Sequence, residues 1–574
     1  MIVKKVTKPK AVSVKKVSKS KSSTKPSRVL VTSALPYVNN VPHLGNLVGS
    51  VLGADAFARF KRLEGNEVLF VLGTDEHGTT AEAKALEEGL TPRQLVDKYF
   101  KIHKEIYEWF GASANCLGRT SSKENKEITT HIFLKLHENG YLKEKTITQL
   151  YSEKSKKFLS DRFVEGECPL CHAKGARGDQ CDACGNLLDP MDLINPICKI
   201  DGTKPVPKET KHLFIDLPKL EPDLKKWIDS KRKTWTPLAL NITDQWLKQG
   251  LKERCITRDL EWGIPVPLKG WEGKVIYSWF DAPIGYIGIT KEVLGAKWED
   301  WWRAEDITLY QFMGKDNVPF HSILFPSFLI GTKEKWHLVD YLDSTAYLNY
   351  EDKKFSKSKG TGVFGDDAIK SGIASDIWRY YLFRVRPQST DSVFEWNDFF
   401  SKVNAELVGN YGNFVNRITS LNEKLFDSVK QKKKLKKLEE QIKPLVEEYK
   451  DLMNKLQLRE ALMKANEISA LGNKYLQENE PWTRAKTDKA EAGSVIAECI
   501  DLAKVLAVLY YPFTPASSEK VFTMLNENKK ILDVGFGKCF EEIKEGTKII
   551  KGEILFQKMD EKQIVEMKKK YSKE

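Results

Sequence analysis

Three short stretches of this sequence hold residues whose types and spacing could do chemistry. The first, HLGN, places His43 and Asn46 around Gly45, where an apolar run with prolines gives way to a helical pattern. A helix N-terminus attracts phosphate through its free N–H groups and its dipole, a histidine adds a donor, and a glycine admits a ligand to the backbone. Taken alone, the motif favours a capped helix with a satisfied histidine, so a phosphate site needs support from elsewhere in the chain.

The second stretch, KKFSKSKG, lies about 310 residues further along the chain. Lysines on a glycine-flanked loop can neutralise the charge on a triphosphate while a bond to phosphorus breaks. A solvated loop would have the same composition, and the motif gains meaning only together with the first. The lysines are Lys353, Lys354, Lys357 and Lys359, and the glycines after them are Gly360 and Gly362.

The third stretch, CPLCHAKGARGDQCDACG, contains two CxxC pairs separated by nine residues. Two chelating turns with four thiolates suit tetrahedral Zn²⁺, and the candidate ligands are Cys168, Cys171, Cys181 and Cys184. The other five of the nine cysteines are scattered, and no signal peptide is apparent. We therefore expect a reducing, cytoplasmic environment and a metal site rather than disulfides.

The elements around these stretches predict an open parallel sheet. RVLVTSALPY, a helical segment and NEVLFVLGTDEHG form a βαβ unit, and ligands of such sheets bind beyond the carboxyl ends of the strands. Asp75 of GTDEHG follows the second strand, where a carboxylate could hold the ammonium group of an amino acid. A helix cap is an equally good interpretation of Asp75.

Further along, the strand pattern is interrupted and later resumes. A Cys-, Gly- and Trp-rich segment predicts an inserted domain, and helical periodicity after residue 395 predicts a helix bundle. The fold class is therefore α/β, a Rossmann-like parallel-sheet domain with a zinc-bearing insertion, followed by an α-helical bundle. The predicted divisions are a Lys-rich tail at 1–27, the two halves of the Rossmann-like domain at 28–144 and 266–395, the insertion at 145–265, the helical domain at 396–556 and a charged C-terminal helix or tail at 557–574.

Most of the net charge of +13 belongs to the N-terminal tail. Residues 1–28 hold nine lysines, one arginine and no acid, which leaves +3 for the rest. A segment this rich in charge and poor in bulky apolar residues is expected to be disordered. Two functions are equally consistent with it, a solubilising tail and an arm that binds RNA phosphates. No apolar run is long enough to span a membrane.

The motifs HLGN and KFSKS, in this order around a split sheet, resemble the HIGH and KMSKS signatures of class I aminoacyl-tRNA synthetases. Together with TSALPYVNNVPHLGN, GTDEHG, SWFDAPIGYIG, GKDNVPFHS and NEPW, they make the chain from about 28 to about 560 resemble the methionyl-tRNA synthetases, nearest the archaeal and eukaryotic cytosolic branch. The resemblance implies a ligase that activates methionine with ATP and Mg²⁺ and transfers it to the 3′-terminal adenosine of tRNA(Met). The substrates supply both nucleophiles, and no catalytic triad is apparent.

The resemblance also implies site residues. It assigns catalysis to His43, Asn46, Lys354 and Lys357, and ATP binding to Tyr37, His43, Gly45, Asn46, Gly314, Asp316 and Lys357. It assigns methionine binding to Leu35, Tyr37, Asp75, Trp279, Ala282, Pro283, Tyr286, Phe320 and His321, an aromatic-rich set that suits a polarizable thioether. It assigns the anticodon to Asn413, Arg417 and Trp482, residue types that hydrogen-bond and stack on unpaired bases.

Two departures from the family pattern matter. The first signature ends in Asn46 rather than histidine, as it does in this branch, and an amide can still donate to phosphate. Many relatives carry a second zinc knuckle, but here its places hold Ser152, Ser155, Cys198 and Asp201. Because serine is a poor zinc ligand, we expect one structural Zn²⁺ per chain.

Two rival functions remain at this point. A class I synthetase for another amino acid is one, although those for branched aliphatic residues normally carry a larger editing insertion. An RNA-binding paralogue without catalysis is the other, and the presence of His43, Asp75 and Lys357 argues against it. No dimerising module is evident, so we expect a monomer.

Overall fold

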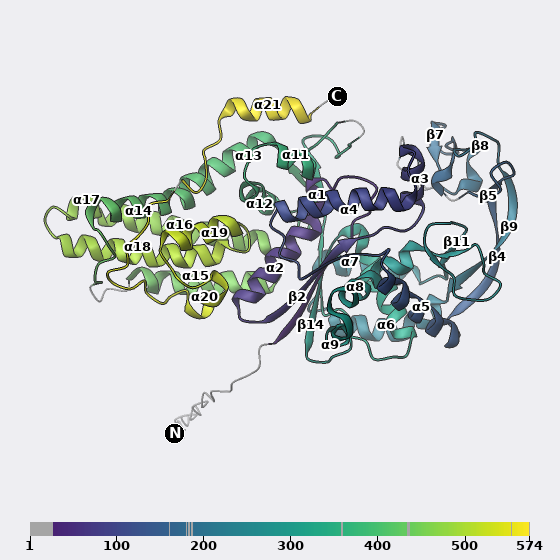
Figure 1. The fold of residues 1–574 in the computed structure, drawn as a ribbon, viewed down its shortest axis with the longest axis horizontal. Coiled ribbons are helices and arrows are strands. Elements are labelled where there is room, and N and C mark those ends of the chain that lie inside the picture. Colours follow the sequence, from purple (N-terminus) through teal and green to yellow (C-terminus); the bar gives the residue numbers. More distant parts are fainter. Residues whose placement is uncertain are drawn as a thin grey trace, which may run out of the picture.

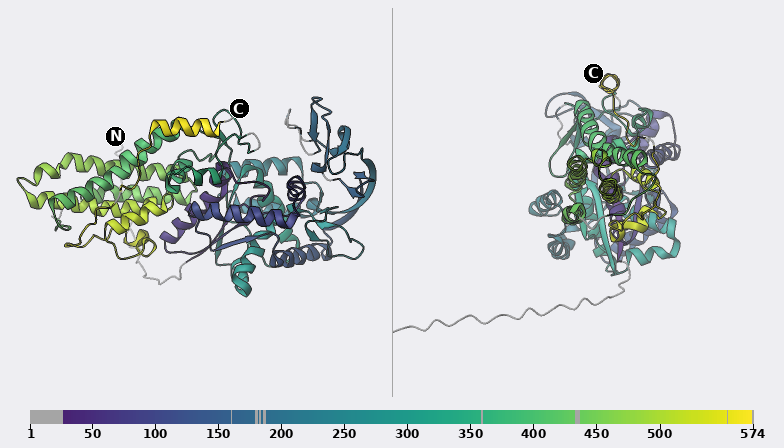
Figure 2. Two further views of the ribbon diagram at one scale, coloured as in Figure 1. Left: turned by 45° about the horizontal axis from the view of Figure 1, so that its top comes forward. Right: turned by 90° about the vertical axis from the view of Figure 1, so that its left-hand side faces the viewer.

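The computed structural model describes residues 27–572, except 160, 179–180, 182–183, 185–187, 358–359, 433–436 and 553. The predicted tail therefore lies outside the described residues apart from Ser27, as does Lys359. The molecule is elongated, with a parallel sheet between a helical bundle at one end and a small β-rich lobe at the other (Figure 1; Figure 2, left).

The predicted parallel sheet is confirmed. Its strand order is β15-β14-β1-β2-β3, and every neighbouring pair is parallel. The order places β1 between its sequence neighbour β2 and the much later β14, so the strands are added outward in opposite directions on the two sides of the β1–β14 boundary, which is the topological switch point. Ligands of doubly wound sheets bind at this switch point. The strands are β1 (Arg28–Ser33), β2 (Glu67–Thr74), β3 (Cys116–Arg119), β14 (Ile307–Gly314) and β15 (Tyr341–Thr345).

Helices cover both faces of the sheet, each with its own core. One face packs against α2 and α4 in the same hydrophobic cluster as the helical bundle. The other packs against α5, α8 and α10 in a second cluster. The helices in these layers are α1 (Leu44–Asn46), the π-helical η1 (Leu47–Val51), α2 (Leu52–Leu63), α3 (Thr79–Glu88), α4 (Pro92–Trp109), α5 (Lys123–Glu138), α8 (Ser278–Leu294), α9 (Glu299–Trp302), the π-helical η6 (Phe320–Leu324) and α10 (Phe325–Gly331).

The segment predicted as an insertion begins with a long antiparallel ribbon of β4 (Leu142–Ser152) and β9 (Val206–Ile215). At its outer end, β6 (Val164–Glu167), β7 (Lys174–Arg177) and β8 (Ile194–Cys198) form a separate three-stranded sheet with a small core of its own. Figure 1 shows this lobe at the right-hand end. After the ribbon, α6 (Leu217–Lys231) and α7 (Pro237–Gln249) return to the core behind the parallel sheet.

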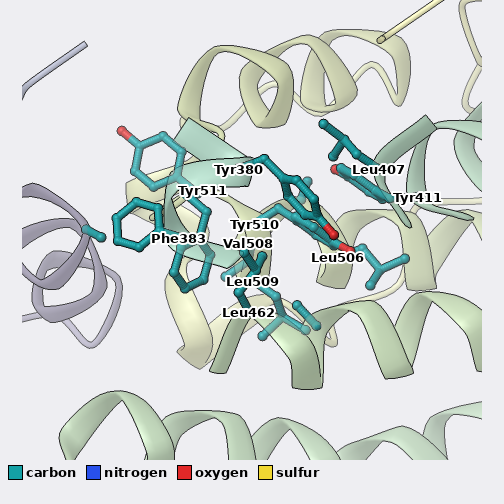
Figure 3. Close-up of a cluster of buried hydrophobic side chains, with 14 of the residues drawn as sticks. Tyr380, Phe383, Leu407, Tyr411, Leu462, Leu506, Val508, Leu509, Tyr510 and Tyr511 are labelled. Carbon is teal, nitrogen blue, oxygen red and sulfur yellow. The ribbon is translucent and has the colours of Figure 1, made fainter. Parts of the chain in front are cut away.

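The predicted helix bundle is also confirmed. Its inner helices are apolar on most sides, as the almost wholly buried α18 shows. Tyr411 and Tyr510 stack face to face with centroids 4.0 Å apart where these helices meet (Figure 3). The helices are α12 (Ser375–Arg384), α13 (Trp396–Lys402), the π-helical η7 (Val403–Gly412), α14 (Asn413–Leu425), α15 (Lys437–Asn454), α16 (Leu458–Asn479), α17 (Pro481–Arg484), α18 (Lys489–Tyr510), α19 (Pro515–Met524) and α20 (Ile531–Lys538).

A buried guanidinium joins the bundle to the sheet. Arg379 of α12 bonds to Asp55 of α2 at 2.8 Å, and both side chains are fully buried. The same guanidinium donates to the carbonyl oxygens of Phe110, Pro512 and Phe513 at 2.7–3.0 Å. Three segments that are far apart in the sequence therefore meet on one side chain, which fixes the bundle against the parallel-sheet domain.

The chain ends in α21 (Glu561–Tyr571), which crosses back from the bundle to the sheet domain (Figure 1). The Tyr571 ring is buried and stacks on Trp396, and the Tyr571 carbonyl accepts from the backbone N–H of Gly362 at 2.9 Å. None of the helices in the described ranges has the length and apolarity that a membrane crossing demands.

Candidate active site and metal site

The fold brings the two predicted phosphate motifs together. The N–H of Leu44 donates to the carbonyl oxygen of Val363, and the N–H of Gly365 donates to that of Pro42 at 2.8 Å. The ring of Phe355, from KFSKS, lies parallel to the His43 ring at 4.6 Å. The motifs thus share one surface at the carboxyl end of β1, next to the switch point of the sheet.

His43 caps the helix that begins at Leu44. Its Nδ1 accepts from the N–H of Gly45 at 3.1 Å, and the Asn46 side-chain oxygen accepts from the N–H of His43 at 3.1 Å. A Cβ on Gly45 would come within 2.9 Å of the His43 ring, so a side chain at this position would displace the ring. Burial lowers the pKa of His43 to about 4, so the ring is neutral at neutral pH. With Nδ1 accepting, the ring proton resides on Nε2, which is the donor the predicted role requires.

Lys357 is held by two acids that the sequence analysis did not single out. Its Nζ lies 2.9 Å from Asp366 and 3.4 Å from Asp367, in the first turn of α11 (Gly365–Lys370). Partial burial raises the pKa of Asp366, but the ion pairs with Lys357 and Lys370 outweigh burial and hold this pKa below its usual range. Lys354, on the same loop, is exposed. In this structure the ammonium group of Lys357 is therefore paired with the acids at the start of α11.

The nine residues predicted to bind methionine surround a single cavity of about 40 Å³. They come from the end of β1, from Asp75 after β2, from the first turns of α8 and from η6. Trp279 is 39% exposed and meets Phe320 edge to face at 5.0 Å, closing the outer side. On the inner side the Tyr286 hydroxyl and His321 Nε2 lie 2.7 Å apart, and His321 Nδ1 lies 2.7 Å from the Asn317 carbonyl oxygen. Ala34 and Asn317 also line the cavity but had not been predicted.

Asp75 is the buried acid of this cavity. Its Oδ1 has no hydrogen-bond partner among the residues that the structure describes. Burial, together with the nearby Asp281 carboxylate, raises the pKa of Asp75 well above its usual range. An unsatisfied carboxylate oxygen in an apolar cavity is a costly arrangement unless a donor arrives. A bound ammonium group would supply that donor.

The residues predicted on the nucleotide side lie across the switch point. Gly314 ends β14, and Asp316 follows in a short 3-10 turn (Lys315–Asn317). The Asp316 carboxylate accepts from the Tyr347 hydroxyl. Tyr37 is 42% exposed and lines the methionine cavity, and it pairs with Asp75 as an isolated parallel bridge. The β1 and β14 ends thus place both sets of predicted residues in one crevice.

The three residues predicted to recognise an anticodon lie in the bundle, remote from this crevice. Asn413 and Arg417 are one turn apart on α14, so they share a face of that helix. The Arg417 guanidinium lies 5.5 Å from the centre of the half-buried Trp482 ring. α14 and α17 reach the outer end of the bundle in Figure 1. These three side chains, whose types can hydrogen-bond to and stack on unpaired bases, thus form one patch on the bundle.

The four predicted metal ligands converge in the β-rich lobe. Their sulfur atoms all lie within 4.8 Å of one another, with Cys168 and Cys184 at 3.9 Å and Cys171 and Cys181 at 3.6 Å. Sulfur atoms around tetrahedral Zn²⁺ with bonds of about 2.3 Å lie roughly 3.8 Å apart. The cluster therefore fits a zinc ion in both donor type and spacing, and within the described ranges it is the one group of this kind.

Hydrogen bonds occupy the place of a second knuckle. Ser152 donates to Asp201, and the N–H of Ser155 donates to the Ser152 hydroxyl at 3.1 Å. The N–H of Thr203 donates to Asp201 at 3.0 Å. The bonds from Ser152 and Thr203 hold the pKa of Asp201 well below its usual range. Polar contacts thus hold this turn together, and the serine hydroxyls in it are poor zinc ligands.

Two family models match the chain. The one described as tRNA synthetases class I (M) matches residues 29–419, and the one described as anticodon binding domain of methionyl tRNA ligase matches residues 427–574.

Named relatives and a solved structure agree with these models. The methionine–tRNA ligase of Borrelia garinii subsp. bavariensis is 48% identical over 95% of this chain and 75% of its own length. The cytoplasmic methionine–tRNA ligase of Saccharomyces cerevisiae is 47% identical over 95% of this chain and 73% of its own length. The structure of Mycobacterium tuberculosis methionyl-tRNA synthetase in complex with methionyl-adenylate superposes with a TM-score of 0.76 at 22% identity, covering 93% of this chain and 100% of that one.

Proposed function

Because the chain belongs to the methionine–tRNA ligases of class I, we propose that it joins methionine to tRNA(Met) in two steps at the crevice between β1 and β14. The observation that carries this proposal is the juxtaposition of a small aromatic cavity with an unsatisfied carboxylate, on one side, and two phosphate motifs on the other. The cavity suits a free apolar amino acid, and the motifs suit the phosphates of ATP.

In the first step a methionine carboxylate oxygen attacks the α-phosphorus of ATP. The bond from that phosphorus to the bridging oxygen breaks, pyrophosphate leaves and methionyl adenylate remains. Because the substrate is itself the nucleophile, the protein contributes position and charge stabilisation. Mg²⁺ would accompany the ATP phosphates and offset part of their charge.

His43, Asn46 and the N-terminus of α1 would hold the phosphates. The neutral His43 ring donates from Nε2 toward them, and its fixed contact with Gly45 aims it. Lys357 must leave Asp366 and Asp367 before it can reach a phosphate. Triphosphate, with more charge than the two acids, would compete for Lys357 and draw the loop inward together with Lys354.

The methionine side chain would enter between Trp279 and Tyr286. A cavity of about 40 Å³ has room for only a few water molecules, so Trp279 and Phe320 must move apart to admit the methionine side chain. Asp75 would hold the ammonium group, and Asp316 would hold the ribose of ATP. In the second step a ribose hydroxyl of the terminal adenosine of tRNA takes the methionyl group, and AMP leaves.

The bundle would recognise the tRNA, with Asn413, Arg417 and Trp482 contacting the anticodon. The buried Arg379 contacts fix the bundle relative to the crevice, as binding two distant parts of one tRNA requires. The four-cysteine cluster would hold one structural zinc ion, which would close the β6–β8 lobe. We further propose a monomer in the cytoplasm, the location that the name of the yeast relative gives.

The decisive experiment is amino-acid-dependent ATP–pyrophosphate exchange with each of the twenty amino acids. Exchange with methionine alone is the expected result and reports adenylate formation and substrate choice together. Exchange driven by another amino acid would contradict the assignment of the cavity. A folded, zinc-loaded protein that exchanges with none of them would instead be an RNA-binding paralogue.

A further inference from the structure

Two residues of GTDEHG have no role in the proposed chemistry. Glu76 and His77 follow Asp75 directly and are both buried, yet neither is among the residues that line the methionine cavity. Glu76 is fully satisfied, since it accepts from Thr74, Ser121 and Arg119. The His77 side chain instead contacts a residue outside its own loop, in helix α8.

The partner of His77 is Asp281 in the first turn of α8. His77 Nδ1 lies 2.7 Å from Asp281 Oδ2, and Asp281 is completely buried. The same turn carries Trp279, Ala282 and Pro283, which form the cavity wall. The bond therefore ties the loop that holds Asp75 to the helix that shapes the cavity.

Asp281 and Asp75 are two buried carboxylates in the same neighbourhood. Both have an Oδ1 atom without a hydrogen-bond partner among the described residues. Burial raises the pKa of Asp281, while the charge and hydrogen bond of His77 lower it. Burial raises the pKa of Asp75, and the Asp281 charge raises it further. The charge balance of His77 and Asp281 thus acts on the acid that would face the substrate.

The other charged groups nearby have partners of their own. Arg119 bonds to Glu76 at 2.7 Å, and Glu82 accepts from the backbone N–H of Trp262. The Trp262 ring meets the His77 ring edge to face at 5.6 Å, and the Arg93 guanidinium lies 4.9 Å from the centre of the Trp262 ring. Besides Asp281 and His77, the titratable groups that interact electrostatically with Asp75 are Glu76, Tyr37 and Tyr286. Glu82, Arg93 and Arg119 lie one contact further out, through Trp262 and Glu76.

We propose that His77 and Asp281 are positioning residues for the ammonium group of methionine, which set the charge beside Asp75 and hold the cavity wall against its loop. This inference rests on the proposed function, in which Asp75 binds that ammonium. Only an ionised Asp75 can do so. Asp281 makes ionisation harder because it adds a second negative charge, and His77 makes it easier because it offsets that charge.

The test uses the full chain and two substitutions that keep the hydrogen bond. Asp281→Asn retains an oxygen acceptor for His77 but removes the carboxylate charge. His77→Asn retains an N–H donor for Asp281 but removes the imidazole ring that offsets the Asp281 charge. The matched control is His131→Asn, which alters a histidine–carboxylate pair with Glu334 at 2.9 Å on the surface of α5. Methionine-dependent exchange gives KM and kcat for methionine between pH 6 and 9, and thermal melting checks the fold.

In the wild type, the KM for methionine should rise as pH falls, because protonated Asp75 cannot hold an ammonium group. Asp281→Asn should move this rise to lower pH, and His77→Asn should move it to higher pH. On the rising part of the curve, a shift of one pH unit changes KM about tenfold. The kcat should change much less than KM, and the control should follow the wild type.

Opposite shifts are the signature of charge, because a merely structural pair would weaken methionine binding in the same way in both variants. Superimposed pH profiles, or two shifts in the same direction, would overturn the inference and leave the function intact. Should Asp281→Asn not fold, His77→Asn decides alone, and a profile that does not move to higher pH counts against the pair. A wild type without methionine-dependent exchange would contradict the function itself.

Discussion

At the level of single residues, two side chains of the KFSKS loop make contacts of different kinds. Lys357 rests on Asp366 and Asp367, while Phe355 of the same loop stacks on the His43 ring. In the proposed mechanism a phosphate replaces the two acids as the partner of Lys357, whereas the ring stacking keeps the two motifs together. The loop thus combines one replaceable interaction with one that anchors it.

Replacing Lys357 with alanine should slow adenylate formation about 10²- to 10³-fold, the usual cost of losing one preorganised charge-stabilising group. The KM for methionine should stay nearly unchanged, because Lys357 does not line the cavity. Pre-steady-state adenylate formation and methionine titration measure the two effects separately. An equal loss in both would contradict the assigned role.

Individual site residues could be predicted from the sequence only where a motif carried them. All nine residues predicted to bind methionine surround one cavity, and their roles in binding stay predictions that the experiments above test. Phe355 was part of a quoted motif, yet nothing local indicated that its ring would stack on His43. Asp281 lies within SWFDAPIGYIG, and its partner His77 lies about 200 residues earlier. Contacts of this separation leave no periodicity in the sequence.

At the level of elements, α21 contacts the KFSKS loop from outside. The ring of Tyr571 stacks on Trp396, and the backbone carbonyl of Tyr571 accepts from the N–H of Gly362, which stands at a φ of +100° where a side chain would strain the turn. Tyr571→Ala removes the ring that fixes this end of α21, so it should loosen the loop and raise the KM for ATP more than that for methionine. Val565→Ala on the same helix is the matched control, since Val565 is 63% exposed. Equal kinetics for both variants would show that α21 does not act on the loop.

The β6–β8 lobe should depend on its metal. Its core is small and separate from the others, so a bound ion contributes much of its folding free energy. Cys181→Ser should reduce bound zinc from one ion per chain to none and open the lobe to proteases. Cys198→Ser, a buried cysteine of β8 outside the cluster, should keep its zinc. Elemental analysis that returned two ions per wild-type chain would show that the hydrogen-bonded turn binds metal after all.

At the scale of the whole molecule, Arg379 joins the helical bundle to the parallel-sheet domain. Removing one partner of a buried ion pair costs about 3–5 kcal/mol because the other charge remains buried. Arg379→Met should therefore lower the free energy of unfolding by about this amount, which denaturant titration would measure. Arg232→Met, which removes half-exposed pairs with Asp229 and Asp244, should cost no more than about 1 kcal/mol. Similar losses in both would contradict the joining role of Arg379.

The same ion pair predicts how acid affects stability. Burial raises the pKa of Asp55, but the charges of Arg59 and Arg379 outweigh burial and hold this pKa well below its usual range. A depressed native pKa contributes stability that is present above the unfolded value of about 3.9 and is lost as pH falls below it. Stability should therefore fall between pH 4 and 3, and less steeply in Arg379→Met, where native Asp55 also takes up a proton. Thermal melts across this range measure both slopes.

The fold class was predictable because strand, loop and helix patterns alternate in the first half and helical periodicity dominates the second. The union of the two domains was not predictable. Arg379 lies in DIWRYYLFR, where any arginine is expected at the surface of an amphipathic helix, and its burial depends on Asp55 more than 300 residues earlier. The return of α6 and α7 to the core of the sheet likewise depends on packing partners that are distant in sequence.

The position of β14 beside β1 also affects how the protein is made. About 280 residues separate the two strands, and a ribosome adds roughly 5–20 residues per second, so β1 waits about 15–60 s for its neighbour. During that interval the nascent chain exposes an apolar strand edge that could pair with another chain. Chaperone demand should therefore peak before residue 307 leaves the exit tunnel, and the strand order of the sheet sets that vulnerable period.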